Sequence, residues 1–178
     1  MKTAIVYFSL EGNTEYVAKK IAQIMGDCDL IKLETEKDYY TEGWKKMLLN
    51  GRDAMKGDTP ELKPFQFNVS EYDKILLGSP IWASRMAPAM KTFIEMYGGD
   101  IVEKGPENIG VFFSQSGNGY KSTFKRMRTE LGVKRVGAEL SMVDPAKHPE
   151  DAVAHFEKIA IFCSQMINGR RRRSRIIR

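Results

Sequence analysis

Short apolar runs alternate along this chain with segments whose apolar residues recur at helical spacing. The apolar runs predict strands at residues 2–8, 28–33, 74–77, 108–113 and 133–142. The helical spacing predicts helices at residues 13–25, 88–97, 120–131 and 150–166. Strands that alternate with helices are typical of βαβ units, so we expect an α/β fold with a parallel sheet.

The segment between the second and third predicted strands, residues 34–72, has a less regular pattern. Residues 43–55 show helical spacing, and residues 60–68 are typical of an extended loop. Connections of this length in compact domains usually cover a site. We therefore expect part of this segment to pack over the edge of a bound ligand.

Length and composition indicate a globular protein. The chain has 178 residues, of which 42% are hydrophobic and 29% charged, so we expect one domain over residues 1–168. No apolar run approaches the ~18 residues that cross a membrane, and the N-terminus lacks the features of a signal peptide. We therefore expect a cytoplasmic protein without a membrane span.

The net charge of +5 comes from the C-terminus. Six of the 28 basic residues are arginines in the last nine positions, which leaves 22 basic against 23 acidic residues elsewhere. The arginine run contains no aromatic residue that would favour nucleic-acid binding. We expect residues 169–178 to form a disordered basic tail, and we predict no specific nucleic-acid partner.

The turn after the first predicted strand, residues 9–14, has the composition of a phosphate-binding loop. Serine, glycine, asparagine and threonine precede a helix start, where backbone N–H groups lack intrahelical partners and favour an anion. The loop lacks the lysine of a nucleotide-triphosphate P-loop and the three glycines of a dinucleotide fingerprint. A simpler alternative is that Asn13 or Thr14 caps the helix and nothing binds.

The wider pattern around this turn carries a family resemblance. The matching positions are Ile5, Val6, Tyr7, Ser9, Gly12, Thr14, Ala18 and Ile21. In these positions the chain resembles the flavodoxin family. The resemblance implies a doubly wound five-stranded parallel sheet of order 2-1-3-4-5 with helices on both faces. It also implies that the phosphate of FMN is bound by Ser9, Glu11, Gly12, Asn13 and Thr14.

In a sheet of that order, ligands lie where the strand order reverses, so the loops after strands one, three and four should converge. The loop after strand three, residues 78–88, is similar to the Gly-x-Pro-x-Trp loop of flavodoxin-like proteins. The resemblance implies that Trp82 flanks the flavin ring, with Pro80, Ile81, Ala83 and Ser84 around it. The alternative is a core or surface tryptophan. We expect the flanking prolines to keep this segment out of regular structure.

The loop after strand four supplies hydrogen-bond donors and small residues. By resemblance it is the second loop at the flavin ring, and its candidate residues are Ser114, Gln115, Ser116, Gly117, Gly119 and Tyr120. Glycines there allow backbone N–H groups to approach a ligand closely. Tyr120 either covers the second face of the ring or starts the next helix.

The remaining reactive side chains give no catalytic or metal-binding pattern. His148 and His155 are seven residues apart, whereas helical metal sites use shorter spacings, so we interpret them as a surface pair. Cys28 and Cys163 are solitary and are interpreted as small buried residues. The methionines, among them Met86, Met90 and Met96, fall at core spacing.

The resemblance implies a non-covalent FMN protein that transfers electrons to a redox partner protein or a small acceptor. We favour an electron carrier, because no nicotinamide-binding signature is visible. The alternative is an FMN-dependent reductase that takes hydride from NAD(P)H and reduces a quinone, a flavin or another acceptor. Arg85 would then pair with the nucleotide phosphate, unless it is a solvated surface residue. A regulatory flavin-binding module is a third possibility.

Overall fold

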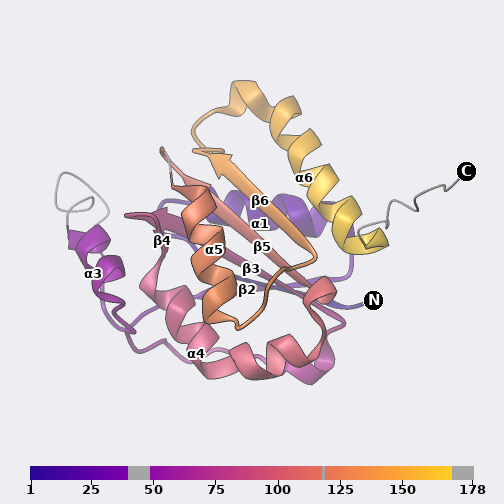
Figure 1. The fold of residues 1–178 in the computed structure, drawn as a ribbon. Helices are drawn as coiled ribbons and strands as arrows, with labels where there is room; N and C mark the ends of the chain where they lie inside the picture. The colour runs from indigo at the N-terminus through magenta and orange to yellow at the C-terminus, as the bar shows by residue number, and fades with distance from the viewer. Residues whose placement is uncertain (40–48, 118, 170–178) are drawn as a thin grey trace, which may run out of the picture.

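The computed structural model describes residues 1–39, 49–117 and 119–169 (Figure 1). Within them, five parallel strands lie in the order β2, β1, β3, β5, β6. Their bounds are β1 Thr3–Phe8, β2 Cys28–Leu33, β3 Lys74–Trp82, β5 Ile109–Gln115 and β6 Ala138–Val143. Counted along the chain, these strands have the predicted order 2-1-3-4-5. The short strand β4 (Arg85–Met86), which pairs antiparallel with the end of β3, is an addition to the predicted sheet.

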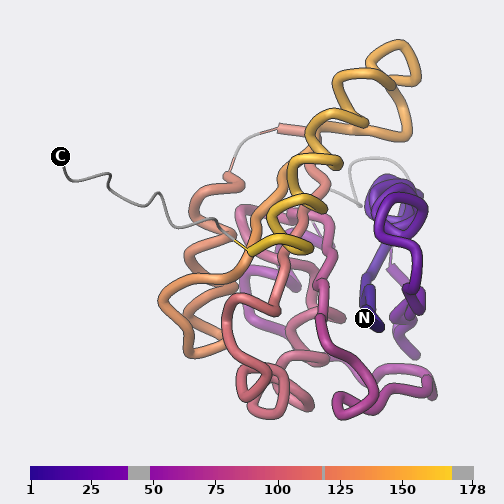
Figure 2. Tube along the Cα trace, turned by 90° about the vertical axis from the view of Figure 1, so that its right-hand side faces the viewer, coloured from indigo at the N-terminus to yellow at the C-terminus, as the bar shows by residue number. Residues whose placement is uncertain are grey.

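Helices cover both faces of the sheet. The helices α1 (Asn13–Met25) and α6 (Ala152–Asn168) pack on one face, and α4 (Pro88–Glu103) and α5 (Tyr120–Glu130) pack on the other. Figure 1 shows α4 and α5 in front of the strands and α1 behind them; the view turned by 90° separates the two layers (Figure 2). Shorter helical segments are α3 Gly51–Lys56, η2 Val69–Glu71, η3 Pro106–Asn108 and η4 Pro149–Asp151.

The central strands are buried on both sides, as their nearly continuous apolar sequences require. On β5, Val111 and Phe113 belong to the core under α4 and α5, whereas Phe112 belongs to the core under α1 and α6. The ring of Phe112 occupies the space that a side chain at Gly78 would need, because a Cβ there would lie 2.1 Å from the ring carbon Cζ. This close packing fixes β3 against β5.

Several element boundaries differ from the sequence-based prediction. The last strand begins at Ala138 rather than near residue 133. Residues 133–137 do not pair with β5; Gly137 packs against the backbone of Glu107, and Lys134 and Arg135 are exposed. α4 continues to Glu103 instead of ending near residue 97, since the buried Ile101 extends its apolar face past two glycines. The predicted helix at residues 43–55 is observed as α3, with residues 43–48 outside the described part of the chain.

Three single-residue predictions are also wrong. His155, predicted on the surface, is only 6% exposed, because it shares an apolar face of α6 with Ile159 and Phe162. Met96 is 56% exposed rather than part of the core. Cys28 is only partly buried, whereas Cys163 is buried and its pKa is raised to about 12 by that burial.

Two further observations concern the domain and membrane predictions. Of the predicted basic tail at residues 169–178, residues 170–178 lie outside the described part of the chain, and Gly169 is the C-cap residue of α6. Among the helices of residues 1–39, 49–117 and 119–169, none is long and apolar enough to cross a membrane.

Candidate functional site

The turn between β1 and α1 presents an open helix start. Gly12 is the N-cap residue, in a left-handed conformation (φ +86°), and it has no side chain to occupy the first turn. The hydroxyl of Ser9 accepts a hydrogen bond from the backbone N–H of Glu15 at 3.2 Å. Helix starts of this kind favour anions, because free N–H groups and the helix dipole act together.

Asn13 and Thr14 lie inside the first turn of the helix, so the prediction that one of them is the N-cap residue is wrong. The Thr14 hydroxyl lies 2.7 Å from that of Ser114 at the end of β5, and both side chains are buried. The Asn13 amide donates to a carboxylate oxygen of Asp144 at 3.2 Å, and its carbonyl oxygen accepts from the N–H of Ala146 at 3.0 Å. These side chains therefore link the turn to two other loops.

One of these is the loop after β6, which sequence reasoning did not include. Asp144 has a left-handed backbone (φ +36°), and the same carboxylate oxygen that accepts from Asn13 accepts from the Ser116 hydroxyl at 2.7 Å. The Lys147 ammonium lies 3.7 Å from Asp144 and 3.7 Å from Glu11. This loop thus places one carboxylate and one ammonium beside the open helix start.

The predicted ring loop after β3 is a short hairpin rather than an irregular segment. Ile81 pairs with Met86 and Trp82 pairs with Arg85. The prolines do not prevent this pairing, because Pro80 lies inside β3 and Pro88 starts α4. The two residues at the tip, Ala83 and Ser84, have φ of 48° and 60°. Left-handed residues other than glycine cost about 1–3 kcal/mol each and are held by their surroundings, often at functional sites.

Trp82 belongs to an aromatic cluster beside the hairpin. Its ring centroid lies 5.8 Å from that of Phe8 and 5.0 Å from that of Tyr39, both in edge-on arrangements. Tyr39 was not predicted for the site. Its hydroxyl is buried without a hydrogen-bond partner among the described residues, and burial raises its pKa above the usual value. The cluster leaves Trp82 partly buried, with rigid support behind it.

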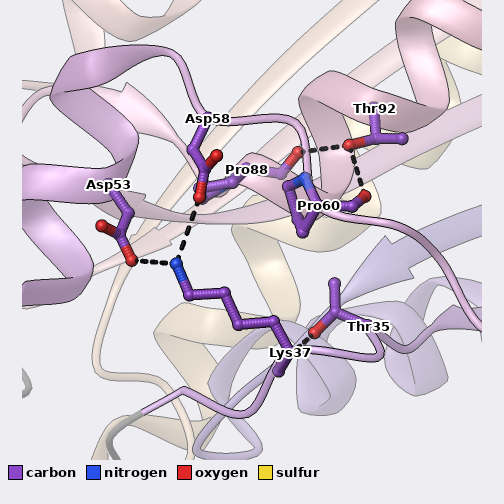
Figure 3. A network of polar contacts seen from close by, with 7 residues as sticks. All are labelled: Thr35, Lys37, Asp53, Asp58, Pro60, Pro88 and Thr92. Atoms are coloured by element: carbon purple, nitrogen blue, oxygen red, sulfur yellow. Dashed lines mark hydrogen bonds and ion pairs between the residues drawn. The ribbon is translucent and has the colours of Figure 1, made fainter.

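A polar network holds the segment that carries Tyr39 (Figure 3). The Lys37 ammonium lies between the carboxylates of Asp53 and Asp58, at 2.6 and 3.1 Å. The Thr35 hydroxyl donates to the Lys37 carbonyl at 2.7 Å, and the Thr92 hydroxyl donates to the Pro60 carbonyl at 3.0 Å. These contacts join two parts of the segment between β2 and β3, residues 35–37 and α3, and attach Pro60 of the same segment to α4. Tyr39 brings this segment into contact with Trp82; that it covers the edge of a bound ligand stays a prediction.

The loop after β5 contacts the other loops at three points. Ser114 bonds Thr14, Ser116 bonds Asp144, and Gly119 (φ +110°) lies against the hairpin tip, where an added Cβ would be 2.5 Å from the Ser84 hydroxyl. A Cβ added at Gly117 would meet no atom within 4 Å, so this residue borders open space. Three of the predicted loops are therefore joined at one edge of the sheet.

Gln115 and Tyr120 are placed differently. The Gln115 amide donates to the Ser141 hydroxyl at 2.9 Å on the α5 face of the sheet, and its carbonyl oxygen has no partner among the described residues. Tyr120 is the first residue of α5 and is 38% exposed, with its ring 6.5 Å from that of Phe124. Gln115 therefore points away from the phosphate-type loop, and Tyr120 does start the helix.

Electrostatically, the site is mixed. Arg85 is partly buried and forms no ion pair with residues 1–39, 49–117 or 119–169. In the first turn of α1, hydrogen bonds from Lys19 and Lys32 hold the pKa of Glu15 below its usual value. On β1, burial, followed by the charge of Glu15, raises the pKa of Tyr7 to about 12. Tyr7 is therefore neutral at physiological pH.

Comparison with known protein families shows to which family this chain belongs. The flavodoxin family model matches residues 2–150 of the chain. The chain belongs to the flavodoxin family. The match spans β1 to η4 and includes every loop described above, so the site lies within the family region of this flavodoxin.

Solved structures show the same fold. A flavoprotein from Lactobacillus acidophilus NCFM, in complex with FMN, is 23% identical with a TM-score of 0.65, over 84% of this chain and 97% of that chain. Oxidised Flavodoxin 2 from Bacillus cereus is 22% identical with a TM-score of 0.55, over 94% of this chain and 99% of that chain. A flavodoxin described as WrbA-like, from Agrobacterium tumefaciens, is 17% identical with a TM-score of 0.55, over 94% and 95%.

Two contributors to this flavodoxin site, Tyr39 and the Asp144 loop, have only weak sequence signals. The fifth parallel strand ends at the same sheet edge as the others, and an Asp-Pro pair follows it, which would have justified including its loop. Nothing near Tyr39 marks it, because its role depends on the fold bringing residue 39 to residue 82.

Proposed function

We propose that this protein binds FMN non-covalently and acts as an electron carrier. The observation that carries the proposal is the open start of α1 at Gly12, beside loops that Thr14, Ser114 and Gly119 hold together. The family match and the FMN complex of the Lactobacillus structure support FMN as the ligand.

The residues present fit the phosphate of FMN. Backbone N–H groups of the first turn of α1 and the Ser9 hydroxyl would hold the phosphate, which needs no lysine in the loop. The negative charge of the Asp144 carboxylate disfavours an anion at this place. Hydrogen bonds from Asn13 and Ser116 hold the carboxylate there. Lys147 offsets that charge, since its ammonium lies 3.7 Å from Asp144.

The hairpin and the loop after β5 would hold the ring system. Trp82 offers an aromatic surface supported by Phe8 and Tyr39, and Gly117 leaves backbone groups open to a ligand edge. The strained tip at Ala83 and Ser84 would keep Trp82 in position. When bound, FMN supplies reversible one- and two-electron chemistry, and the protein contributes binding, orientation and electrostatics.

The reductase is the second candidate, and Arg85 favours it. Arg85 pairs with Trp82 in the ring hairpin, and its guanidinium has no carboxylate partner among the described residues. Such a group suits the phosphate of a nicotinamide nucleotide. The fold similarity to the WrbA-like flavodoxin is compatible with both candidates.

Ligand titration followed by redox assays tests the proposal. The purified protein should bind FMN with one site per chain and then, after dithionite reduction, pass electrons to a one-electron acceptor. A carrier should not be reduced by NADH or NADPH under anaerobic conditions. A protein that binds neither FMN nor riboflavin would contradict the proposal at its first step.

A further inference from the structure

The exposed side of α5 and the turn that follows it form a basic face. Five exposed basic side chains lie within fifteen consecutive residues: Lys121, Lys125, Arg126, Lys134 and Arg135. None of them pairs with an acidic residue of the described chain. Glu130 is the one exposed carboxylate within the same stretch, and Arg128 is already paired with Glu139 on β6. We call these five residues the α5 basic face.

This charge is local. Outside the arginine-rich C-terminus the chain has 22 basic and 23 acidic residues, so an excess on one helix means a deficit elsewhere. Several lysines on other elements do have acidic partners: Lys19 and Lys32 contact Glu15, and Lys37 contacts Asp53. A surface patch of one sign without internal partners projects a field into solvent and steers oppositely charged proteins.

The N-terminal end of the α5 basic face, at Lys121, borders the candidate FMN site. α5 begins at Tyr120, one residue after Gly119, which lies against Ser84 of the ring hairpin. Figure 1 shows α5 beside β4, on the front of the sheet. Arg85, on β4, adds a further positive charge there that has no acidic partner within residues 1–39, 49–117 and 119–169. Lys134 and Arg135 precede β6 and lie toward the opposite edge of the sheet, because Ala138 pairs with Gly110 at the start of β5. A protein attracted to Lys121, Lys125 and Arg126 would therefore approach the end of the molecule where we place the flavin ring.

We propose that the α5 basic face docks an acidic redox protein that exchanges electrons with the flavin. The proposal rests on the proposed function, because it needs FMN in the site. The partner is a one-electron carrier, so two oxidised partner molecules accept the two electrons of one fully reduced FMN, and the flavin protons leave to solvent. The complementarity is electrostatic, so it governs association rate more than the strength of the final complex.

The test uses two forms of one acceptor that differ in surface charge. Native cytochrome c is basic, and succinylated cytochrome c is acidic, while the haem that accepts the electron is the same. The full chain, loaded with FMN and reduced with dithionite, is mixed with each ferric form in a stopped-flow instrument. Ionic strength is raised from about 0.01 M to about 0.15 M, which shortens the Debye length from about 30 Å to about 8 Å.

The docking proposal predicts opposite responses of the two forms. Reduction of the succinylated form should be fast at low salt and should slow by roughly tenfold as salt is added, since steering raises association rates by about 10–10³. Reduction of native cytochrome c should be slow at low salt and should not slow further. Equal rates for both forms, or rates independent of salt, would overturn the proposal.

Variants in which glutamine replaces basic residues show which part of the surface causes the salt-dependent rate. Lys121→Gln, Lys125→Gln and Arg126→Gln together should slow reduction of the succinylated form by roughly three- to tenfold at low salt. The matched control is Lys20→Gln, Lys63→Gln and Lys158→Gln, which removes the same charge from α1, from the segment before β3 and from α6. Residues 170–178 are present in every variant, so their charge cannot cause a difference in rate between the variants.

The outcomes separate the two proposals. If the wild-type protein takes up no FMN, the proposed function fails before any acceptor is added. If FMN binds and both triple variants reduce the succinylated form equally well, the docking proposal fails while the proposed function stands. Binding of polyuridylate that is lost in the α5 variant, together with unchanged electron transfer, would assign the face to nucleic acid and also overturn the docking proposal.

Discussion

The hydroxyls of Thr14 and Ser114 meet at 2.7 Å, buried between the first turn of α1 and the end of β5. These two residues are a hundred positions apart in the sequence, and their contact fixes the distance between two of the loops that form the site. Asp144 adds a second link, through Asn13 and Ser116. Loops held by such side-chain bonds are preorganised, so a ligand loses less free energy in ordering them.

Replacement of Thr14 by valine should therefore weaken both the fold and the site. Valine keeps the shape of the side chain but leaves the buried Ser114 hydroxyl without its partner, which costs about 1–3 kcal/mol. Urea unfolding of the ligand-free protein measures this loss. The double variant Thr14→Val, Ser114→Ala removes both hydroxyls and should lose less stability than the sum of the two single variants. Strict additivity would show that the two hydroxyls do not interact.

Riboflavin should bind far more weakly than FMN, because it lacks the phosphate that the start of α1 would hold. Hydrogen bonds to a charged group contribute about 1.5–3 kcal/mol each, so the loss of several should lower affinity by orders of magnitude. Fluorescence titration of the purified protein with both flavins measures the difference. Ser9→Ala should narrow the difference in affinity between the two flavins, whereas Ser164→Ala, on the exposed side of α6, should leave it unchanged. Equal wild-type affinities would remove the phosphate from the site.

Asp144→Asn should raise affinity for FMN. Asparagine tolerates the left-handed backbone at this position and can still accept hydrogen bonds from Asn13 and Ser116. The substitution removes a negative charge beside the place assigned to the phosphate, so the Kd for FMN should fall severalfold while the affinity for riboflavin changes little. Asp144→Ala is the comparison, because it also removes the two hydrogen bonds. An unchanged Kd in the asparagine variant would place the phosphate away from Asp144.

The parts of the fold and of the candidate site that depend on local sequence pattern could be predicted, whereas those that depend on contacts between distant residues could not. The strand order and the loops after β1, β3 and β5 could be anticipated, because they follow from apolar periodicity, small-residue turns and the rule for where parallel sheets bind ligands. The hairpin at Trp82 could not, since its tip depends on Ala83 and Ser84 adopting left-handed backbones that only the surrounding contacts stabilise.

The burial of single polar residues could not be predicted from the sequence pattern either. The sequence spacing of the histidines excluded a helical metal pair, but it did not show that His155 faces α1, where its ring lies 6.4 Å from that of Tyr16. Tyr39 and Asp144 enter the site through contacts across long sequence separations, 43 residues to Trp82 and 131 to Asn13, respectively. Such contacts are set by tertiary packing rather than by local pattern.

Trp82→Ala should weaken FMN binding and restore flavin fluorescence. A stacked indole quenches flavin emission, and its loss should cost about 1–3 kcal/mol of binding free energy, the scale of a buried aromatic side chain. Tyr39→Phe keeps the ring that supports Trp82 and removes a buried hydroxyl without a described partner, so it should preserve quenching and leave the unfolding free energy unchanged or higher. If Trp82→Ala changes neither emission nor affinity, Tyr120 becomes the better candidate for ring contact.

Anaerobic mixing with NADH or NADPH separates a carrier from a reductase. A carrier has no site that holds the nicotinamide ring against the flavin, and without that geometry hydride transfer should be too slow for turnover. The flavin absorbance should therefore persist for minutes after mixing. Rapid bleaching, followed by steady turnover with a quinone, would instead identify a reductase.

In that case Arg85→Ala should raise the KM for NADPH without lowering FMN content, because the guanidinium in the ring hairpin would hold the nucleotide phosphate. Arg52→Ala, which removes an exposed arginine on α3, is the matched control and should leave that KM unchanged.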